Sequence, residues 1–201
     1  MNIPGINQVA PSINLYKISN KDKSFLKRLR ESINVKELMP STKITKAEYE
    51  RWQEMLNLAL DKAVLSDRTC VIASNNNKPC GIITYQPGKN KYHLDCICTW
   101  PVEKGKKVTL AGQTLFKQMF SDFLSNKANV IYLTAILNGP FSTVSKYMKL
   151  GFKQTGGEKF LVSMRTNRER TLNAMKELDN IITTTISPDR KEVNLLDELE
   201  L

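Results

Sequence analysis

Apolar positions recur along the chain with periods that predict a definite order of strands and helices. Residues 1–12 read as an irregular arm, because Pro4, Gly5 and Pro11 interrupt them. Beyond the arm, apolar residues repeat every second position, as in strands, or every third or fourth, as in helices. In chain order the pattern predicts a strand over 13–19, helices over 22–33 and 46–65, strands over 69–73, 81–85 and 92–100, a helix carrying Leu115 to Phe123, a strand over 130–137, a helix opened by Pro140, a strand over 160–164 and a helix over 167–182.

Local signals support several of these elements. Thr45 and Glu48 have the spacing of a capping box at the start of the second helix. Pro140 stands at the favoured first position of a helix, and Gly151 suits the position just past its end. The run from 130 to 137 is almost continuously apolar, so we expect a strand buried on both faces.

The order of these elements predicts an α/β fold with a central mixed β-sheet flanked by helices. The consecutive middle strands pair as hairpins, and the later strand–helix–strand unit requires a right-handed parallel crossover. A chain of 201 residues suits one domain with small extensions. We expect the domain over 13–165, an added C-terminal helix over 166–186, and an acidic, weakly ordered tail over 187–201.

The added C-terminal helix carries an apolar stripe of Leu172, Met175, Leu178 and Ile182. Such a stripe is too apolar to be left in water and must pack against something. The chain's own sheet and a second subunit are both open as partners. We lean towards the second, a homodimer, because the predicted core is complete without this helix.

Composition places the protein among ordinary globular proteins, with 41% hydrophobic and 25% charged residues. The longest apolar run, 130–137, is too short to cross a bilayer. The N-terminal segment has neither the basic region nor the apolar core of a secretion signal. We therefore expect a soluble, cytoplasmic protein without a membrane partner.

All four cysteines (Cys70, Cys80, Cys96 and Cys98) lie within apolar, strand-like runs, and His93 is the one histidine. No pair has the CxxC spacing of a zinc site. We interpret the cysteines as small buried core residues in a reducing compartment rather than as metal ligands, and we expect no metal.

The charge is unevenly distributed. Thirty basic and twenty acidic residues give +10, but the last thirteen residues contain five acids and two bases. The first 188 residues therefore hold 28 basic and 15 acidic residues, or +13. A basic body attracts anions such as nucleotide phosphates, nucleic acid or an acidic partner, although it also serves simply to keep a protein in solution.

One passage combines features of an anion site. The strand over 92–100 leads through a segment rich in glycine and lysine into the helix that carries Leu115. The free N–H groups at a helix start, with its partial positive charge, can cradle phosphates, and Lys104, Lys106 and Lys107 add charge. The spacing is neither that of a Walker loop nor G-x-G-x-x-G, so an ordinary surface loop remains an alternative.

Here the sequence resembles a known family. Ile97 to Pro101, then basic residues, Gly112 and a helix, look like the cofactor passage of the GNAT N-acetyltransferases. The run from Tyr147 to Phe152, YMKLGF, is similar to the Tyr-x-Lys-Leu-Gly-Phe sequence that ends the family's next helix and begins its following strand. The predicted element order over 13–165 also agrees, so the resemblance covers about three quarters of the chain.

The resemblance implies acetyl-CoA as co-substrate and a set of residues that would hold it. The strand end would offer backbone groups to pantetheine and the thioester carbonyl, and the segment from Lys107 would hold the phosphates. Leu110 stands where the family usually has glycine, and its Cβ limits the allowed backbone angles. The implied contacts are Cys98, Thr99, Trp100, Lys107, Val108, Leu110, Ala111, Gly112, Gln113, Thr114 and Asn138.

Direct transfer of an acyl group to an amine needs a donor for the oxyanion and a proton for the departing thiolate. The resemblance at YMKLGF implies that Tyr147 is the proton donor, and a phenol, protonated at neutral pH, can serve as one; the spacing alone favours helix packing. His93 and Asp95, on one strand face, and Glu103 are candidate bases. A water relay or an amine that is already neutral would make a base unnecessary.

Three functions remain open from the sequence. The first is an active N-acetyltransferase whose acceptor is an amine-bearing small molecule, a peptide or an aminoacyl group. The second is a nucleic-acid-binding protein, suggested by the basic body and by the basic residues of the first helix. The third is an acyltransferase fold without catalysis that serves as a binding scaffold, which the Leu110 departure keeps open.

Overall fold

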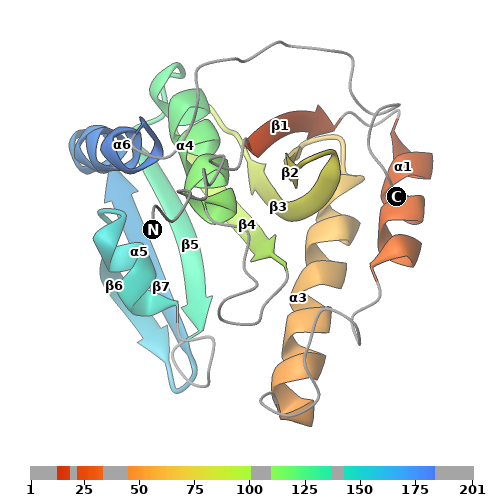
Figure 1. The fold of residues 1–201 in the computed structure, drawn as a ribbon. Coiled ribbons are helices and arrows are strands. Elements are labelled where there is room, and N and C mark those ends of the chain that lie inside the picture. The colour runs from red at the N-terminus through yellow and green to blue at the C-terminus, as the bar shows by residue number, and fades with distance from the viewer. Residues whose placement is uncertain (1–12, 19–21, 34–44, 101–109, 137–142, 184–201) are drawn as a thin grey trace, which may run out of the picture.

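The computed structural model describes residues 13–18, 22–33, 45–100, 110–136 and 143–183. The elements follow the predicted order, with one additional strand (Figure 1). They are β1 (Ile13–Ile18), α1 (Lys23–Ser32), α3 (Lys46–Ala63), β2 (Thr69–Asn75), β3 (Lys78–Gln86), β4 (Lys91–Thr99), α4 (Ala111–Leu124), β5 (Val130–Ile136), α5 (Val144–Lys149), β6 (Lys153–Glu158), β7 (Leu161–Asn167) and α6 (Arg168–Thr183).

A seven-stranded mixed sheet in the order β1-β2-β3-β4-β5-β7-β6 forms the centre of the molecule. Neighbouring strands are antiparallel except β4 and β5, which are parallel. The tight β2–β3 turn places Asn76 and Asn77 at positive φ, which asparagine tolerates better than most residues. The predicted α/β fold with a mixed sheet is thus confirmed.

Helices cover both faces of the sheet and bury two apolar clusters. On one face, α1 and α3 bury Leu29, Trp52 and Leu60 against β2, β3 and β4. On the other, α4 buries Leu115, Met119 and Phe120 against the centre of the sheet, and Tyr147 of α5 packs at the edge of the same cluster. Figure 1 shows α3 and α4 on either side of β4.

All four cysteines are free and buried, as expected of core residues.

Among the described residues, none of the helices is long and apolar enough to span a membrane.

The expectation for β5 was wrong in one respect. Ile131, Leu133 and Ala135 are buried under α4, but Thr134 is exposed and Ile136 is half-buried. The strand therefore alternates instead of being buried on both faces. The reason is a cavity that opens on its second face, described below.

Strand β6 was missed because it carries no apolar signal. Every residue of Lys153–Glu158 is exposed, and the strand lies at the edge of the sheet, paired only with β7. The predicted opening of α5 at Pro140 lies outside the described residues, and the observed helix begins at Val144, after Thr143 as N-cap.

The apolar stripe of α6 is buried within the chain. Leu178 and Ile182 are 2% and 4% exposed and belong to the cluster beneath α4, while Leu172 is 49% exposed. Lys117 of α4 also forms an ion pair with Asp179 of α6. The buried face runs through Thr171, Ala174 and Leu178, so Leu172 was wrongly assigned to it. The stripe does not require a second subunit, and a homodimer stays a prediction.

Candidate functional site

The site begins where two neighbouring strands separate. Strands β4 and β5 pair only from Lys91 to Leu94 and from Val130 to Leu133. Opposite β3, Thr84 pairs with Cys96 and Tyr85 with Leu94, so Asp95 is an extra residue that forms a β-bulge. A bulge bends its strand and increases the local twist. Beyond the bulge, β4 stays paired with β3 up to Thr99 and β5 with β7 up to Ile136, but the two strands no longer pair with each other, and a slot opens between them.

The bulge also changes the face on which the β4 side chains lie. Before it, Tyr92 and Leu94 point into the cluster beneath α4. After it, Cys96 and Cys98 point into the cluster beneath α3. In a regular strand Leu94 and Cys96 would share one face. The bulge thus turns two thiols towards α3 at the point where the slot opens.

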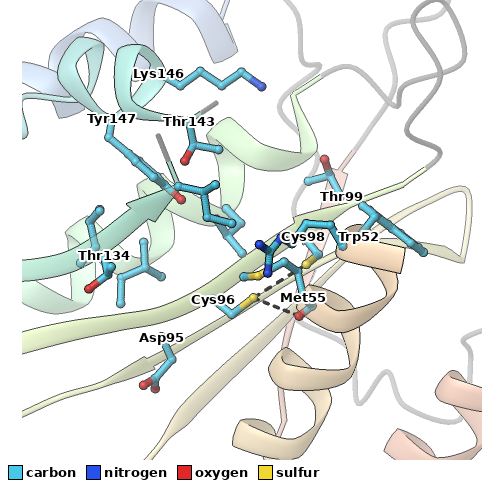
Figure 2. Close-up of a pocket in the computed structure, with 15 residues that line it drawn as sticks. Trp52, Met55, Asp95, Cys96, Cys98, Thr99, Thr134, Thr143, Lys146 and Tyr147 are labelled. Atoms are coloured by element: carbon cyan, nitrogen blue, oxygen red, sulfur yellow. Dashed lines mark hydrogen bonds between the residues drawn. The ribbon is translucent and has the colours of Figure 1, made fainter. Parts of the chain in front are cut away.

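A cavity of about 170 Å³ fills the slot (Figure 2). It is walled by two helices from opposite faces of the sheet, α3 on one side and the start of α5 on the other. Its lining residues are Arg51, Trp52 and Met55 of α3, Leu94 to Thr99 of β4, Leu133, Thr134 and Ile136 of β5, and Thr143, Lys146 and Tyr147 at α5.

The backbone of β4 offers hydrogen-bonding groups to this slot. The Trp100 N–H donates to the Cys80 carbonyl at 2.9 Å, so that peptide group faces β3. Because peptide groups alternate along a strand, the N–H and C=O groups of Ile97 and Thr99 face the opposite way. Strand β5 has separated there, and these groups face the cavity instead of a neighbouring strand.

Tyr147 lies on the α5 side of the cavity, and the YMKLGF run explains its placement. Gly151 adopts φ +83° and ends the helix. The Phe152 N–H donates to the Tyr147 carbonyl and the Gly151 N–H to that of Met148, both at 3.0 Å, which is the Schellman arrangement. The rings of Phe116 and Phe152 each lie edge-on at 5.9 Å from the Tyr147 ring.

The hydroxyl of Tyr147 points across the cavity towards β4, beside Thr143 (Figure 2). Burial raises the pKa of Tyr147, and the hydrogen bond with the Thr143 side chain only partly opposes this shift. The phenol therefore stays protonated at neutral pH and is available as a donor.

The start of α4 lies beside the end of β4. A Cβ on Gly112 would stand 3.8 Å from the Thr99 methyl group, which places the first helical turn next to the slot. The N-cap residue Leu110 makes no side-chain hydrogen bond to this helix, and the N–H groups of the first turn have no partner within the helix itself. Leu110 adopts φ +73°, the left-handed conformation that glycine favours, and its side chain is buried.

The predicted cofactor residues fall into three groups. Cys98 and Thr99 line the cavity, whereas Trp100 is buried next to them in the α3 cluster. Gly112 and Gln113 are accessible in the first turn of α4, while the side chains of Ala111 and Thr114 are buried. The Thr114 hydroxyl donates to the Leu110 carbonyl at 2.9 Å and stiffens this turn. Lys107, Val108 and Asn138 lie outside the described residues.

Two of the three candidate bases are described. Asp95 lines the cavity, with its side chain 5% exposed, 2.6 Å from Arg68 Nε and 3.2 Å from His93 Nδ1. Burial raises the pKa of this carboxyl, but the hydrogen bonds and charges of His93 and Arg68 outweigh it and hold the pKa below its ordinary value. His93 and Asp95 therefore lie together as predicted, though as parts of an ion-pair cluster. Glu103 lies outside the described residues.

The sequence did not reveal the contribution of α3. Arg51, Trp52 and Met55 face the slot, yet their spacing is that of any helix packed on a sheet. The indole N–H of Trp52 is buried and has no hydrogen-bond partner among the residues that the structure describes. A buried donor without a partner is uncommon and suits a ligand that accepts a hydrogen bond.

Comparison with known proteins identifies the fold. No protein-family model matches the sequence, and no curated protein matches it. Among solved structures, the PaiA N-acetyltransferase of Thermoplasma acidophilum in complex with coenzyme A is similar, with a TM-score of 0.53 and 19% identity over 78% of this chain and 99% of that one.

Two further similar structures are FdhC, a nucleotide-linked sugar GNAT (TM-score 0.51, 12% identity, 90% of this chain and 99% of that one), and the spermidine N-acetyltransferase of Vibrio cholerae in complex with CoA and spermine (TM-score 0.50, 15% identity, 80% and 98%). The chain thus has the fold of the GNAT acetyltransferases.

Proposed function

We propose that this protein belongs to the GNAT superfamily and transfers an acetyl group from acetyl-CoA to a primary amine, by direct attack within a ternary complex. The observation that carries the proposal is the slot between β4 and β5, where backbone groups of Ile97 and Thr99 face the Tyr147 hydroxyl across a cavity walled by helices from both faces of the sheet. The similar structures in complex with CoA support the nature of the donor.

The donor would enter from the face of α4 and α5. The pantetheine arm is an amide-bearing chain, and the free N–H and C=O groups of β4 can pair with it as a neighbouring strand would. The first turn of α4 would hold the phosphates, because its free N–H groups and partial positive charge suit anions. Lys107 and Gly112 are the proposed contacts there, with Asn138 beyond β5.

The acceptor amine would reach the thioester from the α3 face, past Arg51 and Met55. A β4 N–H would stabilise the oxyanion formed on attack, and Tyr147 would protonate the thiolate as it departs. The identity of the general base is supported by fewer observations than that of the acid. Asp95 is bound by Arg68 and His93, and its lowered pKa makes it a weak proton acceptor. Glu103, water, or an amine bound in its neutral form are the better candidates.

The test is calorimetric titration with CoA and acetyl-CoA at low and moderate salt. We expect binding in the micromolar range that weakens with salt, because phosphates are held by charge. Gly112→Val should weaken it, since the added methyl groups lie where the phosphates approach the helix start. Gly156→Val is the matched control, because nothing lies within 4 Å of its Cβ position in the exposed strand β6.

Two results would contradict the proposal. If the folded protein gave no detectable heat with either ligand, the donor assignment would be wrong. If Gly112→Val bound CoA like the parent, the phosphates would lie elsewhere. Binding without CoA thiol release on a panel of amine-bearing small molecules, peptides and aminoacyl compounds would favour the inactive scaffold.

Nucleic-acid binding remains a prediction from the net charge. Lys27 and Arg28 of α1 are exposed, while Arg30 forms an ion pair with Asp61 at 2.5 Å. Titration of bulk tRNA beside CoA would separate the two candidates, since tRNA binding by a protein that ignores CoA would favour the nucleic-acid function.

A further inference from the structure

The α3 side of the cavity contains three sulfur-bearing side chains to whose sulfur atoms the proposed acetyl transfer assigns no chemical step. The Sγ atoms of Cys96 and Cys98 lie 3.8 Å apart, on the same face of β4. Met55 projects from the facing helix, and its carbonyl lies 3.1 Å from Cys96 Sγ. All three residues line the cavity, and Figure 2 shows them grouped on the wall opposite Tyr147.

This grouping depends on the fold and not on the spacing of the cysteines alone. In a regular strand, residues i and i+2 share a face but point in parallel into whatever packs above them. Here the Asp95 bulge turns both thiols out of the α4 cluster. Both thiols therefore line the cavity while their side chains stay buried in the cluster beneath α3.

The chemistry of the three ligands is soft. Thiolates and thioethers select soft ions such as Cu(I), whereas Mg²⁺ and Ca²⁺ need oxygen ligands. A zinc site usually needs four protein ligands, or three in a catalytic site. Within the described part of the chain, no group of three or more His, Cys, Asp or Glu side chains is arranged around a metal position. Two thiolates and a thioether therefore fit a soft ion of low coordination number.

We propose that Cys96, Cys98 and Met55 form a binding site for a soft monovalent metal ion of the Cu(I) type. Binding replaces two S–H bonds by two metal–sulfur bonds and releases two protons to solvent, without any change of oxidation state. The Met55 thioether supplies the third ligand. Because the thiols must lose their protons, affinity rises with pH.

The site lies on the side of the slot from which the acceptor amine would arrive. On the proposed function, the loaded protein should bind CoA but transfer acetyl groups slowly, because the ion and its ligands narrow that entrance. Metal binding itself does not depend on the proposed function, and its test uses no acetyl transfer. A failure of one proposal is therefore distinguishable from a failure of the other.

The test is an anaerobic competition, in which the reduced full-length protein withdraws Cu(I) from a coloured Cu(I) chelator. We expect one equivalent to be bound per chain. Cys96→Ser and Cys98→Ser should each weaken binding by at least about 100-fold, the upper end of what loss of a mere supporting partner costs. Met55→Leu keeps the packing of the side chain and should weaken binding by about tenfold.

The chain supplies its own controls, since Cys70 and Cys80 are also free and buried but do not line the cavity. Cys70→Ala and Cys80→Ala should bind Cu(I) like the parent, with circular dichroism confirming the fold of each variant. Equal loss in these controls, no withdrawal of Cu(I) by the parent, or tighter binding of Zn²⁺ than of Cu(I) would each overturn the proposal. So would a thiol assay showing that Cys96 and Cys98 have become a disulfide in the copper-treated protein.

Discussion

Tyr147 is the side chain on which the proposed chemistry most depends. Replacing it with phenylalanine removes one hydroxyl and keeps the ring packed between Phe116 and Phe152. We expect turnover to fall by roughly 10²–10⁴-fold, the usual loss of a general acid, with CoA affinity unchanged. Tyr132→Phe on β5, outside the cavity lining, is the matched control. Wild-type turnover by Tyr147→Phe would make this residue one that only packs.

The same residue gives an expectation for pH. Burial raises the pKa of Tyr147, so the hydroxyl keeps its proton beyond the ordinary phenol value of about 10. The steady-state rate should therefore show no fall between pH 8 and about 10 caused by loss of the acid. An alkaline fall in this window that disappears in Tyr147→Phe would contradict the assignment.

Asp95, the residue of the bulge, forms a buried ion pair with Arg68 that can be tested by mutation. Asp95→Asn removes the buried carboxylate beside Arg68, whose side chain is 12% exposed, and should cost about 2 kcal/mol of unfolding free energy, the contribution of a hydrogen bond between charged groups. Asp67 also contacts Arg68, at 2.6 Å, but is 58% exposed. Asp67→Asn is thus a matched control, with an expected loss below about 1 kcal/mol.

The pH dependence of that loss has a definite sign. The folded-state pKa of Asp95 is lowered, so its contribution is present above the unfolded value of about 3.9 and is lost as pH falls through the folded value. Urea unfolding of parent and Asp95→Asn should therefore differ most near pH 7 and converge below pH 4. A difference that stays constant down to pH 2.5 would show that the carboxylate charge is not what stabilises the bulge.

For single residues, the sequence predicted which residue types the site needs better than it predicted their backbone conformations. Tyr147 and Gly151 follow from YMKLGF, and the restricted backbone at Leu110 was evident from its Cβ. That Leu110 takes the glycine conformation was not evident, because burial of its side chain against the core offsets a strain of about 1 kcal/mol. The Asp95 bulge could not be predicted, since register is a property of two strands together.

Among the elements, the C-terminal end of α4 is held by a single side chain of α6, Arg168. The Arg168 guanidinium donates to the carbonyls of Leu124, Asn126 and Ala128 at 2.7–3.0 Å, and stacks 5.6 Å above the Phe123 ring. A cation there satisfies carbonyls that have no partner in the helix and complements its negative end. The first residue of α6 thereby ties α6 to the end of α4.

We expect Arg168→Met to lower the free energy of unfolding by about 2–4 kcal/mol, because several carbonyls lose a charged donor. Arg168→Lys should retain only part of the stability that Arg168 provides, since one ammonium group cannot reach all three carbonyls. Arg165→Met, at an exposed position of β7, should change stability by less than about 0.5 kcal/mol. Chemical denaturation of the three variants tests this, and equal stability of parent and Arg168→Met would refute the capping role.

The sequence predicted the helices and strands that bury one face, because their apolar residues recur with a regular period. It did not predict a strand that buries neither face. Helices α1, α3, α4 and α6 follow from their apolar spacing, whereas β6 is exposed throughout and forms only because β7 offers it a free edge. Strand β5 shows the converse error. Its apolar run reads as a strand buried on both faces, but one face borders the slot.

For the whole molecule, the functional site is a property of the assembled sheet. The order of elements predicts the fold, and the family resemblance implies that Thr99 at the end of β4 and Tyr147 of α5 belong to one site. Residues such as Arg51, Met55 and Cys96 meet only because β4 and β5 separate beneath α3. No local pattern encodes that separation, and the α3 wall was accordingly missed.

Helix α6 packs its buried face into the cluster beneath α4, and two leucines of this helix test that packing. Leu178 is 2% exposed beneath α4, whereas Leu172 is 49% exposed. Leu178→Asp places a charge in an apolar cluster without a partner, so the protein should unfold at much lower urea concentration or aggregate. Leu172→Asp should leave stability within about 0.5 kcal/mol.

Light scattering on the same pair addresses the homodimer. Because the buried face of α6 is satisfied within the chain, a dimer through this helix would have to use its exposed face, where Leu172 lies. If the parent is a monomer, Leu172→Asp keeps its mass; if the parent is a dimer through α6, the substitution halves the mass while the fold persists. A Leu178→Asp variant as stable as the parent would show that α6 does not pack on α4 in solution.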